Sequence, residues 1–119
     1  MGANVLIVDD SAFMRNMLRN IITQAGANVS GEAADGQEAV DKTKELQPQI
    51  VFLDIMMPNV NGLDALKQIK QEFPDVKVVM CTSAGQEKII AEAVESGASE
   101  FVKKPFKPDE VSQVIAKLS

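Results

Sequence analysis

Short, unbroken apolar runs alternate along the chain with longer segments whose apolar residues recur every three or four positions. A short run without polar alternation is typical of a strand buried on both faces, and the spacing of three and four is typical of an amphipathic helix. The runs predict strands at residues 5–8, 28–33, 50–54, 76–81 and 99–103. The periodic segments predict helices at residues 12–25, 39–46, 62–72, 86–96 and 111–118.

The order of these elements predicts the fold class. Strands and helices alternate strictly, so a helical crossover joins each pair of successive strands and the strands run parallel. Right-handed crossovers place helices on both faces of the sheet, which predicts an α/β protein with a five-stranded, doubly wound parallel sheet. The partly polar segment 28–33 is expected at a sheet edge. Residues 1–119 are expected to form a single domain.

The composition narrows the class of protein. With 45% hydrophobic and 24% charged residues, the chain is typical of a soluble globular protein. It has no apolar run near the ~18 residues that a membrane helix needs, and no signal-peptide pattern at its start, so we expect a cytoplasmic protein. The net charge of −5 argues against non-specific nucleic-acid binding.

Two residue types restrict the chemistry. The sequence contains no histidine, which excludes histidine-based catalysis and a Cys/His zinc site within this chain. The single cysteine, Cys81, stands in an apolar run and is expected to be an inert buried thiol. Phosphoryl or proton chemistry therefore has to use carboxylates, hydroxyl groups, lysine or metal-bound water.

Polar residues follow or end four of the five predicted strands. Because the carboxyl ends of parallel strands meet at one edge of the sheet, these residues should lie together. They are Asp9, Asp10, Asp54, Thr82 (with Ser83) and Lys104. Three carboxylates in one place repel one another by about 1 to 4 kcal/mol per close pair. One divalent cation and one lysine would balance their charge, and Mg²⁺ suits carboxylate oxygens with an incomplete protein shell.

Taken singly, these residues also have plain structural explanations. An aspartate after a strand often only turns or caps the chain, and Asp9-Asp10-Ser11 could simply favour a helix start. Thr82 could bond to backbone, Phe101 could be core, and five methionines are expected to pack in the core. These are Met14, Met17, Met56, Met57 and Met80.

The joint arrangement favours a reactive site over those separate explanations. A carboxylate such as Asp54 can act as an oxygen nucleophile toward a phosphoryl group. Phosphoryl transfer needs mainly positioning and charge neutralisation, and Lys104 and Thr82 are the residue types that can contact phosphoryl oxygens.

Four motifs, in order along the chain, resemble the receiver domain of bacterial response regulators. They are Asp9-Asp10, the motif Asp-x-x-Met-Pro-x-x-x-Gly that begins at Asp54, the hydroxyl of Thr82, and Lys-Pro-Phe beginning at Lys104. Val-Asp-Asp-Ser-Ala-Phe-Met-Arg and Glu-Phe-Val-Lys-Lys-Pro-Phe are similar to stretches of the chemotaxis members. The resemblance covers the whole chain and implies a flavodoxin-like sheet with strand order 2-1-3-4-5.

The resemblance implies a role for each matching residue. Asp54 would accept a phosphoryl group from a phosphohistidine. Asp10 would bind Mg²⁺ directly and Asp9 mainly through water, with the backbone carbonyl of Met56 as a further ligand. Lys104 would pair with a phosphoryl oxygen, and the Lys104–Pro105 bond would be cis.

The resemblance also implies a switch. Thr82 would move toward the phosphoryl group, Phe101 would follow inward, and the face formed by the fourth helix, fifth strand and fifth helix would change. The implied partners are a CheA-like histidine kinase and a phospho-dependent target such as a flagellar motor switch protein. A phosphatase is a further partner that the resemblance allows. The protein is expected to be a monomer that binds neither nucleic acid nor membrane.

Several positions depart from the usual family pattern. Ser83 stands where alanine is usual, Lys103 is a second lysine beside Lys104, and Phe101 lacks a tyrosine hydroxyl. Met56 and Ala84, each two positions after a site residue, cannot position an attacking water, which predicts slow loss of the phosphoryl group.

Two other functions remain open at this stage. One is an intermediate phosphoryl carrier in another phosphorelay, which would differ only in its partners. The other is a Mg²⁺-dependent phosphatase of the aspartyl-phosphate type. Such an enzyme needs a second acid and usually a cap domain to enclose its substrate, and the chain has no room for a cap. A signalling switch is therefore preferred to an enzyme.

Overall fold

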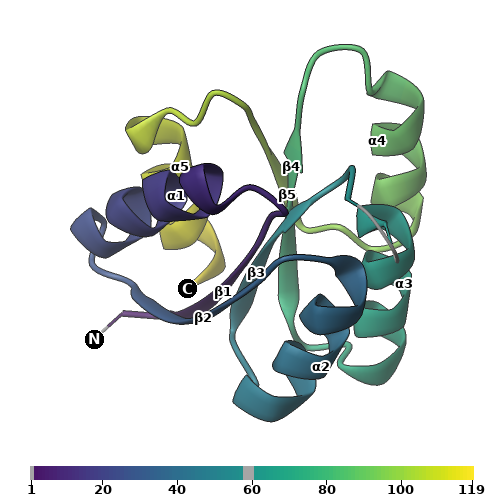
Figure 1. The fold of residues 1–119 in the computed structure, drawn as a ribbon, viewed down its shortest axis with the longest axis horizontal. Helices are drawn as coiled ribbons and strands as arrows, with labels where there is room; N and C mark the ends of the chain where they lie inside the picture. Colours follow the sequence, from purple (N-terminus) through teal and green to yellow (C-terminus); the bar gives the residue numbers. More distant parts are fainter. Residues whose placement is uncertain (1, 58–60) are drawn as a thin grey trace.

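The computed structural model describes residues 2–57 and 61–119. In this part of the chain, parallel strands form one sheet in the order β2-β1-β3-β4-β5 (Figure 1). The strands are β1 (Asn4–Val8), β2 (Asn28–Ala33), β3 (Ile50–Asp54), β4 (Lys77–Thr82) and β5 (Glu100–Lys103). The α/β class, the strand order and the edge position of β2 are confirmed.

Helices cover both faces of the sheet. They are α1 (Ala12–Gln24), α2 (Gly36–Leu46), α3 (Gly62–Glu72), α4 (Glu87–Glu95) and α5 (Pro108–Leu118). Figure 1 shows α1 and α5 on one face and α2, α3 and α4 on the other. Each of the helices α1, α2 and α3 begins after a side-chain cap. The caps are Ser11, Asp35 and Asn61, and each side chain accepts a hydrogen bond from the backbone N–H three residues further along the chain.

The central strand β3 explains why its sequence is a continuous apolar run. Alternate residues of a strand point to opposite faces. Ile50 and Phe52 pack in the core beneath α1 and α5, whereas Val51 and Leu53 pack in the core beneath α2, α3 and α4. All four side chains are fully buried. A strand with helices on both sides has no face on which polar side chains would meet water.

Some predicted boundaries shift by a few residues. The fourth strand begins at Lys77 and runs through Thr82, one residue later than predicted at each end. The second helix begins at Gly36, three residues earlier than predicted, because the preceding Asp35 caps it. The last helix begins at Pro108, where the fixed φ of proline suits a first helical turn. The predicted chain break at Pro58 lies outside the described residues.

Candidate functional site

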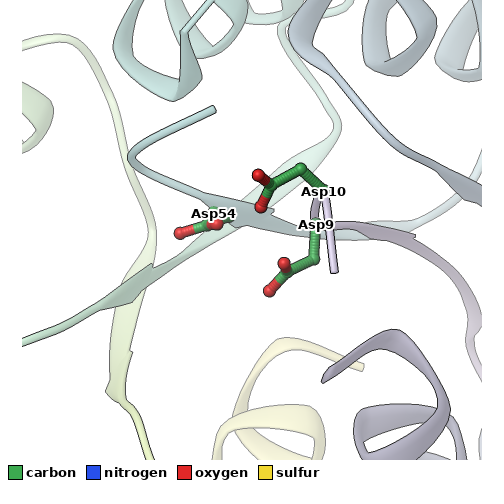
Figure 2. Close-up of side chains that lie close together, drawn as sticks. All are labelled: Asp9, Asp10 and Asp54. Carbon is green, nitrogen blue, oxygen red and sulfur yellow. The ribbon is translucent and has the colours of Figure 1, made fainter. Parts of the chain in front are cut away.

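The strand register brings the first acidic residues together. Val8 of β1 pairs with Leu53 of β3. The next residues, Asp9 and Asp54, therefore lie side by side at the carboxyl ends of these two neighbouring strands. Asp10 is the next residue along the chain. Carboxylate oxygens of Asp9, Asp10 and Asp54 lie within 4.8 Å of one another. Figure 2 shows the Asp10 side chain inclined toward Asp54, with all three carboxylates bordering one space.

Asp9 is buried and held through three of its groups. Its backbone N–H donates to the carbonyl of Ala33 at 3.1 Å. One carboxylate oxygen accepts the backbone N–H of Ser11 at 2.9 Å, and the other accepts the ammonium of Lys104 at 2.7 Å. The exposed fraction of Asp9 is 3%, whereas Asp10 beside it is exposed. Asp9 is therefore the fixed member of the cluster, and Asp10 is the one open to solvent.

Asp54 is buried at the end of β3. Burial raises the pKa of its carboxyl group, and the nearby Asp9 carboxylate adds to this effect. The Lys104 ammonium and a hydrogen bond from the Met56 backbone act in the opposite direction, but the net shift of the pKa is upward. The ionised form of Asp54 is thus less favoured in the folded protein than in water.

Lys104 is the cation of the site. Its Nζ lies 2.7 Å from Asp9 and 3.3 Å from Asp54. Burial alone would lower the pKa of this ammonium, but the hydrogen bond to Asp9 and the charge of Asp54 outweigh it, so the pKa is raised. The neighbouring Lys103 points to solvent, and the Lys104–Pro105 peptide bond is cis, as the resemblance implied. The structure therefore places Lys104, and not Lys103, at the carboxylates.

The first residue of α3 is packed against the end of β3. The N–H of Gly62 donates to the carbonyl of Ile55 at 2.8 Å. A Cβ atom at Gly62 would overlap the carbonyl oxygen of Asp54 and the Cα of Ile55. Only glycine allows this close approach, which fixes the start of α3 relative to Asp54.

Thr82 and Phe101 make no hydrogen bond or ion pair with the acidic cluster in the described residues. Thr82 is buried, and its hydroxyl donates to the carbonyl of Val102 at 3.4 Å. Ser83 is exposed, and its backbone N–H donates to the side chain of Gln86 at 2.6 Å. Phe101 is partly buried against the core beneath α2, α3 and α4. Thr82 is thus the more enclosed of the two adjacent hydroxyls.

Met56 corrects one prediction from the sequence. Its side chain is 57% exposed and does not pack in the core. Met56 follows the end of β3 by two residues, where the chain has left the sheet. The other four methionines are buried or partly buried against the two cores, as predicted.

Cys81 lies beneath the cluster, opposite Asp54 in the register of β3 and β4. Its thiol is buried, and burial raises the pKa well above its ordinary value. A thiol that stays protonated is neither a nucleophile nor a metal ligand. The prediction of a buried, inert thiol is therefore supported.

The donor set fits a hard divalent cation. Three carboxylates offer oxygen ligands within 4.8 Å of one another, and they face a single ammonium. Mg²⁺ prefers oxygen ligands from a few carboxylates and keeps part of its water shell. The exposed Asp10 leaves one side of the cluster open for that water.

Two residues that support the site, Arg15 and Glu32, were not predicted from the sequence. Nη1 of Arg15 donates to the backbone carbonyl of Asp9 at 2.6 Å, and Nε of Arg15 donates to Glu32 at 2.9 Å. The available signal was the four-residue spacing of Arg15 and Arg19, which places both on one side of a helix. That spacing indicates a shared partner, but it does not indicate which one.

Comparison with known proteins identifies a family. The sequence model described as "Response regulator receiver domain" matches residues 5–116. The Chemotaxis protein CheY of Thermotoga maritima is 51% identical over 119 residues, covering 100% of this chain and 99% of that protein. The Chemotaxis protein CheY of Bacillus subtilis is 43% identical over 117 residues and covers 98% of each chain.

Solved structures agree with this match. The response regulator domain of Thermotoga maritima CheB superposes with a TM-score of 0.84 at 40% identity. The superposition covers 98% of this chain and 92% of that one.

A search of the described helices for a membrane-spanning segment, which needs both sufficient length and an apolar sequence, finds none.

Proposed function

This chain belongs to the response regulator receiver domain family, and we propose that it is a chemotaxis-type switch that accepts a phosphoryl group on Asp54. The observation that supports this most directly is the cluster of Asp9, Asp10 and Asp54 within 4.8 Å, with Lys104 between two of the carboxylates. The family and the likeness to chemotaxis proteins support a signalling role.

The proposed donor is a phosphohistidine on a CheA-like histidine kinase. A carboxylate oxygen of Asp54 forms a bond to phosphorus while the P–N bond of the donor breaks, and the electron pair returns to the imidazole nitrogen. Lys104 then balances charge on the phosphoryl oxygens, since its ammonium already lies 3.3 Å from Asp54. Asp9 holds Lys104 in place through its 2.7 Å hydrogen bond.

Mg²⁺ is the proposed cofactor. Asp10 and Asp54 would hold it directly, Asp9 mainly through water, and the carbonyl of Met56 would complete the protein ligands. When bound, the ion neutralises charge on the carboxylates and on the transferring phosphoryl group. The raised pKa of Asp54 supports a need for this added positive charge.

The proposed switch involves Thr82 and Phe101. The Thr82 hydroxyl would exchange its 3.4 Å hydrogen bond to Val102 for one to a phosphoryl oxygen. Phe101, which is only partly buried, could then move inward and change the surface between β5 and α5. That surface has a hollow of about 290 Å³ lined in part by Phe101, Val114 and Lys117. We propose that a phospho-dependent target, such as a flagellar motor switch protein, docks on the α4-β5-α5 face.

We propose slow spontaneous loss of the phosphoryl group. Met56 and Ala84, the positions two after Asp54 and Thr82, carry no group that could orient a water for attack. The exposed Met56 side chain lies beside the site and offers only apolar surface there. A phosphatase partner would then control the lifetime of the signal.

Incubation with acetyl phosphate tests the proposal. With Mg²⁺, intact-mass spectrometry should find one added phosphoryl group, and peptide mapping should place it on Asp54. Chelation by EDTA and the variant Asp54→Asn should both remove it. Asp64→Asn, at an exposed position of α3, is the matched control and should be phosphorylated like the wild type. Phosphorylation of Asp54→Asn to the wild-type extent would refute the assignment.

Two alternatives are separated by further measurements. Sustained turnover of phosphomonoesters would indicate a phosphatase of the aspartyl-phosphate type instead of a switch. Transfer from phosphorylated Asp54 to a histidine of a second protein would indicate an intermediate carrier in a phosphorelay. A single, stable adduct without turnover favours the switch. We propose a cytoplasmic monomer that binds neither nucleic acid nor membrane.

A further inference from the structure

Arg15 links the acidic cluster to β2 through two different nitrogen atoms. Its Nη1 donates to the backbone carbonyl of Asp9 at 2.6 Å, and its Nε donates to the Glu32 carboxylate at 2.9 Å. Only 18% of the Arg15 side chain is exposed. The planar guanidinium presents several N–H donors in fixed directions, so one arginine side chain can bridge two separate acceptors. A lysine ammonium is a compact charge and lacks this fixed arrangement of donors.

Glu32 is in turn held from two sides. Arg19, one helical turn after Arg15, approaches the second carboxylate oxygen of Glu32 at 2.7 Å through Nη2 and 2.8 Å through Nε. Partial burial would raise the pKa of Glu32, but hydrogen bonds from Arg19 and Arg15 outweigh it and lower the pKa. Glu32 is therefore ionised at neutral pH and provides a fixed anchor for Arg15.

The contact at Asp9 also bears on Asp10. The carbonyl of Asp9 and the N–H of Asp10 belong to one planar peptide unit. With the Asp9 N–H bonded to Ala33 and its carboxylate bonded to Ser11 and Lys104, the carbonyl is the remaining polar group of Asp9, and Arg15 occupies it. Fixing that carbonyl fixes the plane from which the Cα of Asp10 departs. Asp10 itself is exposed, and within residues 2–57 and 61–119 no hydrogen bond or ion pair holds its carboxylate.

We propose that Arg15, anchored by Glu32, is a positioning residue that orients the Asp9–Asp10 peptide so that the Asp10 carboxylate faces Mg²⁺. This inference rests on the proposed function, because it assumes that the acidic cluster binds the ion. Groups that orient metal ligands without touching the metal typically contribute about 10- to 100-fold to metal affinity.

Titration calorimetry with MgCl₂ tests the inference on the folded, unphosphorylated protein. Arg15→Met should weaken Mg²⁺ binding by about 10-fold or more. Arg19→Met is the matched control, because Arg19 shares the Glu32 partner but, within the described residues, makes no hydrogen bond or ion pair with the acidic cluster; its Mg²⁺ affinity should stay within about twofold of the wild type. Arg15→Lys keeps the positive charge but loses the planar set of guanidinium donors. Its Mg²⁺ affinity should therefore be closer to that of Arg15→Met than to that of the wild type.

Glu32→Gln provides a second route if Arg15→Met does not fold. It leaves Arg15 able to reach Asp9 but weakens its anchor, so its Mg²⁺ affinity should fall between those of the wild type and Arg15→Met. With acetyl phosphate, the variants of Arg15 and Glu32 should need more Mg²⁺ for half-maximal phosphorylation, yet approach the wild-type rate at saturating Mg²⁺. A role in folding alone would not produce that separation.

The outcomes distinguish this inference from the proposed function. Equal weakening in Arg15→Met and Arg19→Met, or unchanged affinity in Arg15→Met with lower stability, would overturn the positioning role while leaving the magnesium site intact. Absence of Mg²⁺ binding by the wild type would overturn the magnesium site and the positioning role together. Selective weakening in the variants of Arg15 and Glu32 would support both.

Discussion

Two neighbouring charged clusters have opposite balances of charge. In the acidic cluster, three carboxylates (Asp9, Asp10 and Asp54) lie together, and the ammonium of Lys104 pairs with two of them, Asp9 and Asp54. In the arginine cluster, one carboxylate, Glu32, is shared by the guanidinium groups of Arg15 and Arg19. The two meet at the backbone carbonyl of Asp9, which accepts a hydrogen bond from Arg15.

The pKa values of the two central carboxylates show the consequence. The pKa of Asp54 is raised by burial and by Asp9, whereas the pKa of Glu32 is lowered because hydrogen bonds from two arginines outweigh its partial burial. Two arginines thus offset the cost of burying Glu32, whereas Lys104 does not fully offset the cost of burying Asp54. Added positive charge would therefore favour the ionised form of Asp54.

Removing one cation from each cluster should give the largest difference in stability. Lys104→Met leaves Asp9 and Asp54 buried without a counter-charge and should lower the free energy of unfolding by about 3 to 5 kcal/mol in Mg²⁺-free buffer. Arg19→Met removes a partly exposed partner and should lower it by less than about 1 kcal/mol. Urea denaturation monitored by circular dichroism measures both. Equal losses would mean that the two clusters do not differ as described.

Added Mg²⁺ should stabilise the protein only through the acidic cluster. At a free concentration of ~100 times its Kd, a ligand that binds only the folded state stabilises it by about 2.7 kcal/mol. Thermal unfolding with increasing MgCl₂ should therefore show a rising Tm in the wild type and in Arg19→Met, but little change in Asp10→Asn. A rise of the same size in Asp10→Asn would place the ion elsewhere.

Neutralising Asp54 should stabilise the metal-free protein. Because the pKa of Asp54 is raised on folding, its ionised form opposes folding at pH 7, and Asp54→Asn should have a higher free energy of unfolding than the wild type in EDTA. The gain should disappear as the pH falls through the raised pKa, since the wild-type carboxyl group is then protonated as well. A gain that is constant at all pH values would show that charge is not its cause.

Glu32 should show the opposite pH dependence. Its pKa is lowered on folding, so its contribution to stability is present above its ordinary value of 4.5 and is lost as the pH falls through the lowered value. The difference in stability between the wild type and Glu32→Gln should therefore shrink on acidification below pH 4.5. Acid unfolding curves of the two proteins test this, and a difference that grows in acid would contradict it.

Much of the acidic cluster could be predicted because it follows from strand ends. Asp9 directly follows the apolar run of β1, and Asp54 ends the apolar run of β3; parallel pairing brings such positions to one edge of the sheet. The choice of Lys104 over Lys103 also followed, since Lys104 directly follows β5 and neighbouring side chains of an extended chain point to opposite sides. These features depend on backbone topology, which the apolar pattern determines well.

The remaining features depend on individual side-chain directions. Arg15 could have pointed to solvent, and only the packing of α1 beside β2 brings its guanidinium to Glu32 and to the Asp9 carbonyl. The exposure of Met56 depends on how the chain leaves β3, and the hydrogen bond of the Thr82 hydroxyl depends on its rotamer. Apolar periodicity carries no information about such choices, because several directions suit the same pattern.

The single cysteine has a practical consequence for studying the switch. Since Cys81 is buried and its thiol stays protonated, reagents that require an accessible thiolate will react with it slowly. A cysteine introduced at the exposed Val94 on α4 can therefore be labelled selectively with a fluorophore or spin label, without first removing the native thiol. A label at this position would report on movement of α4 by fluorescence or electron spin resonance.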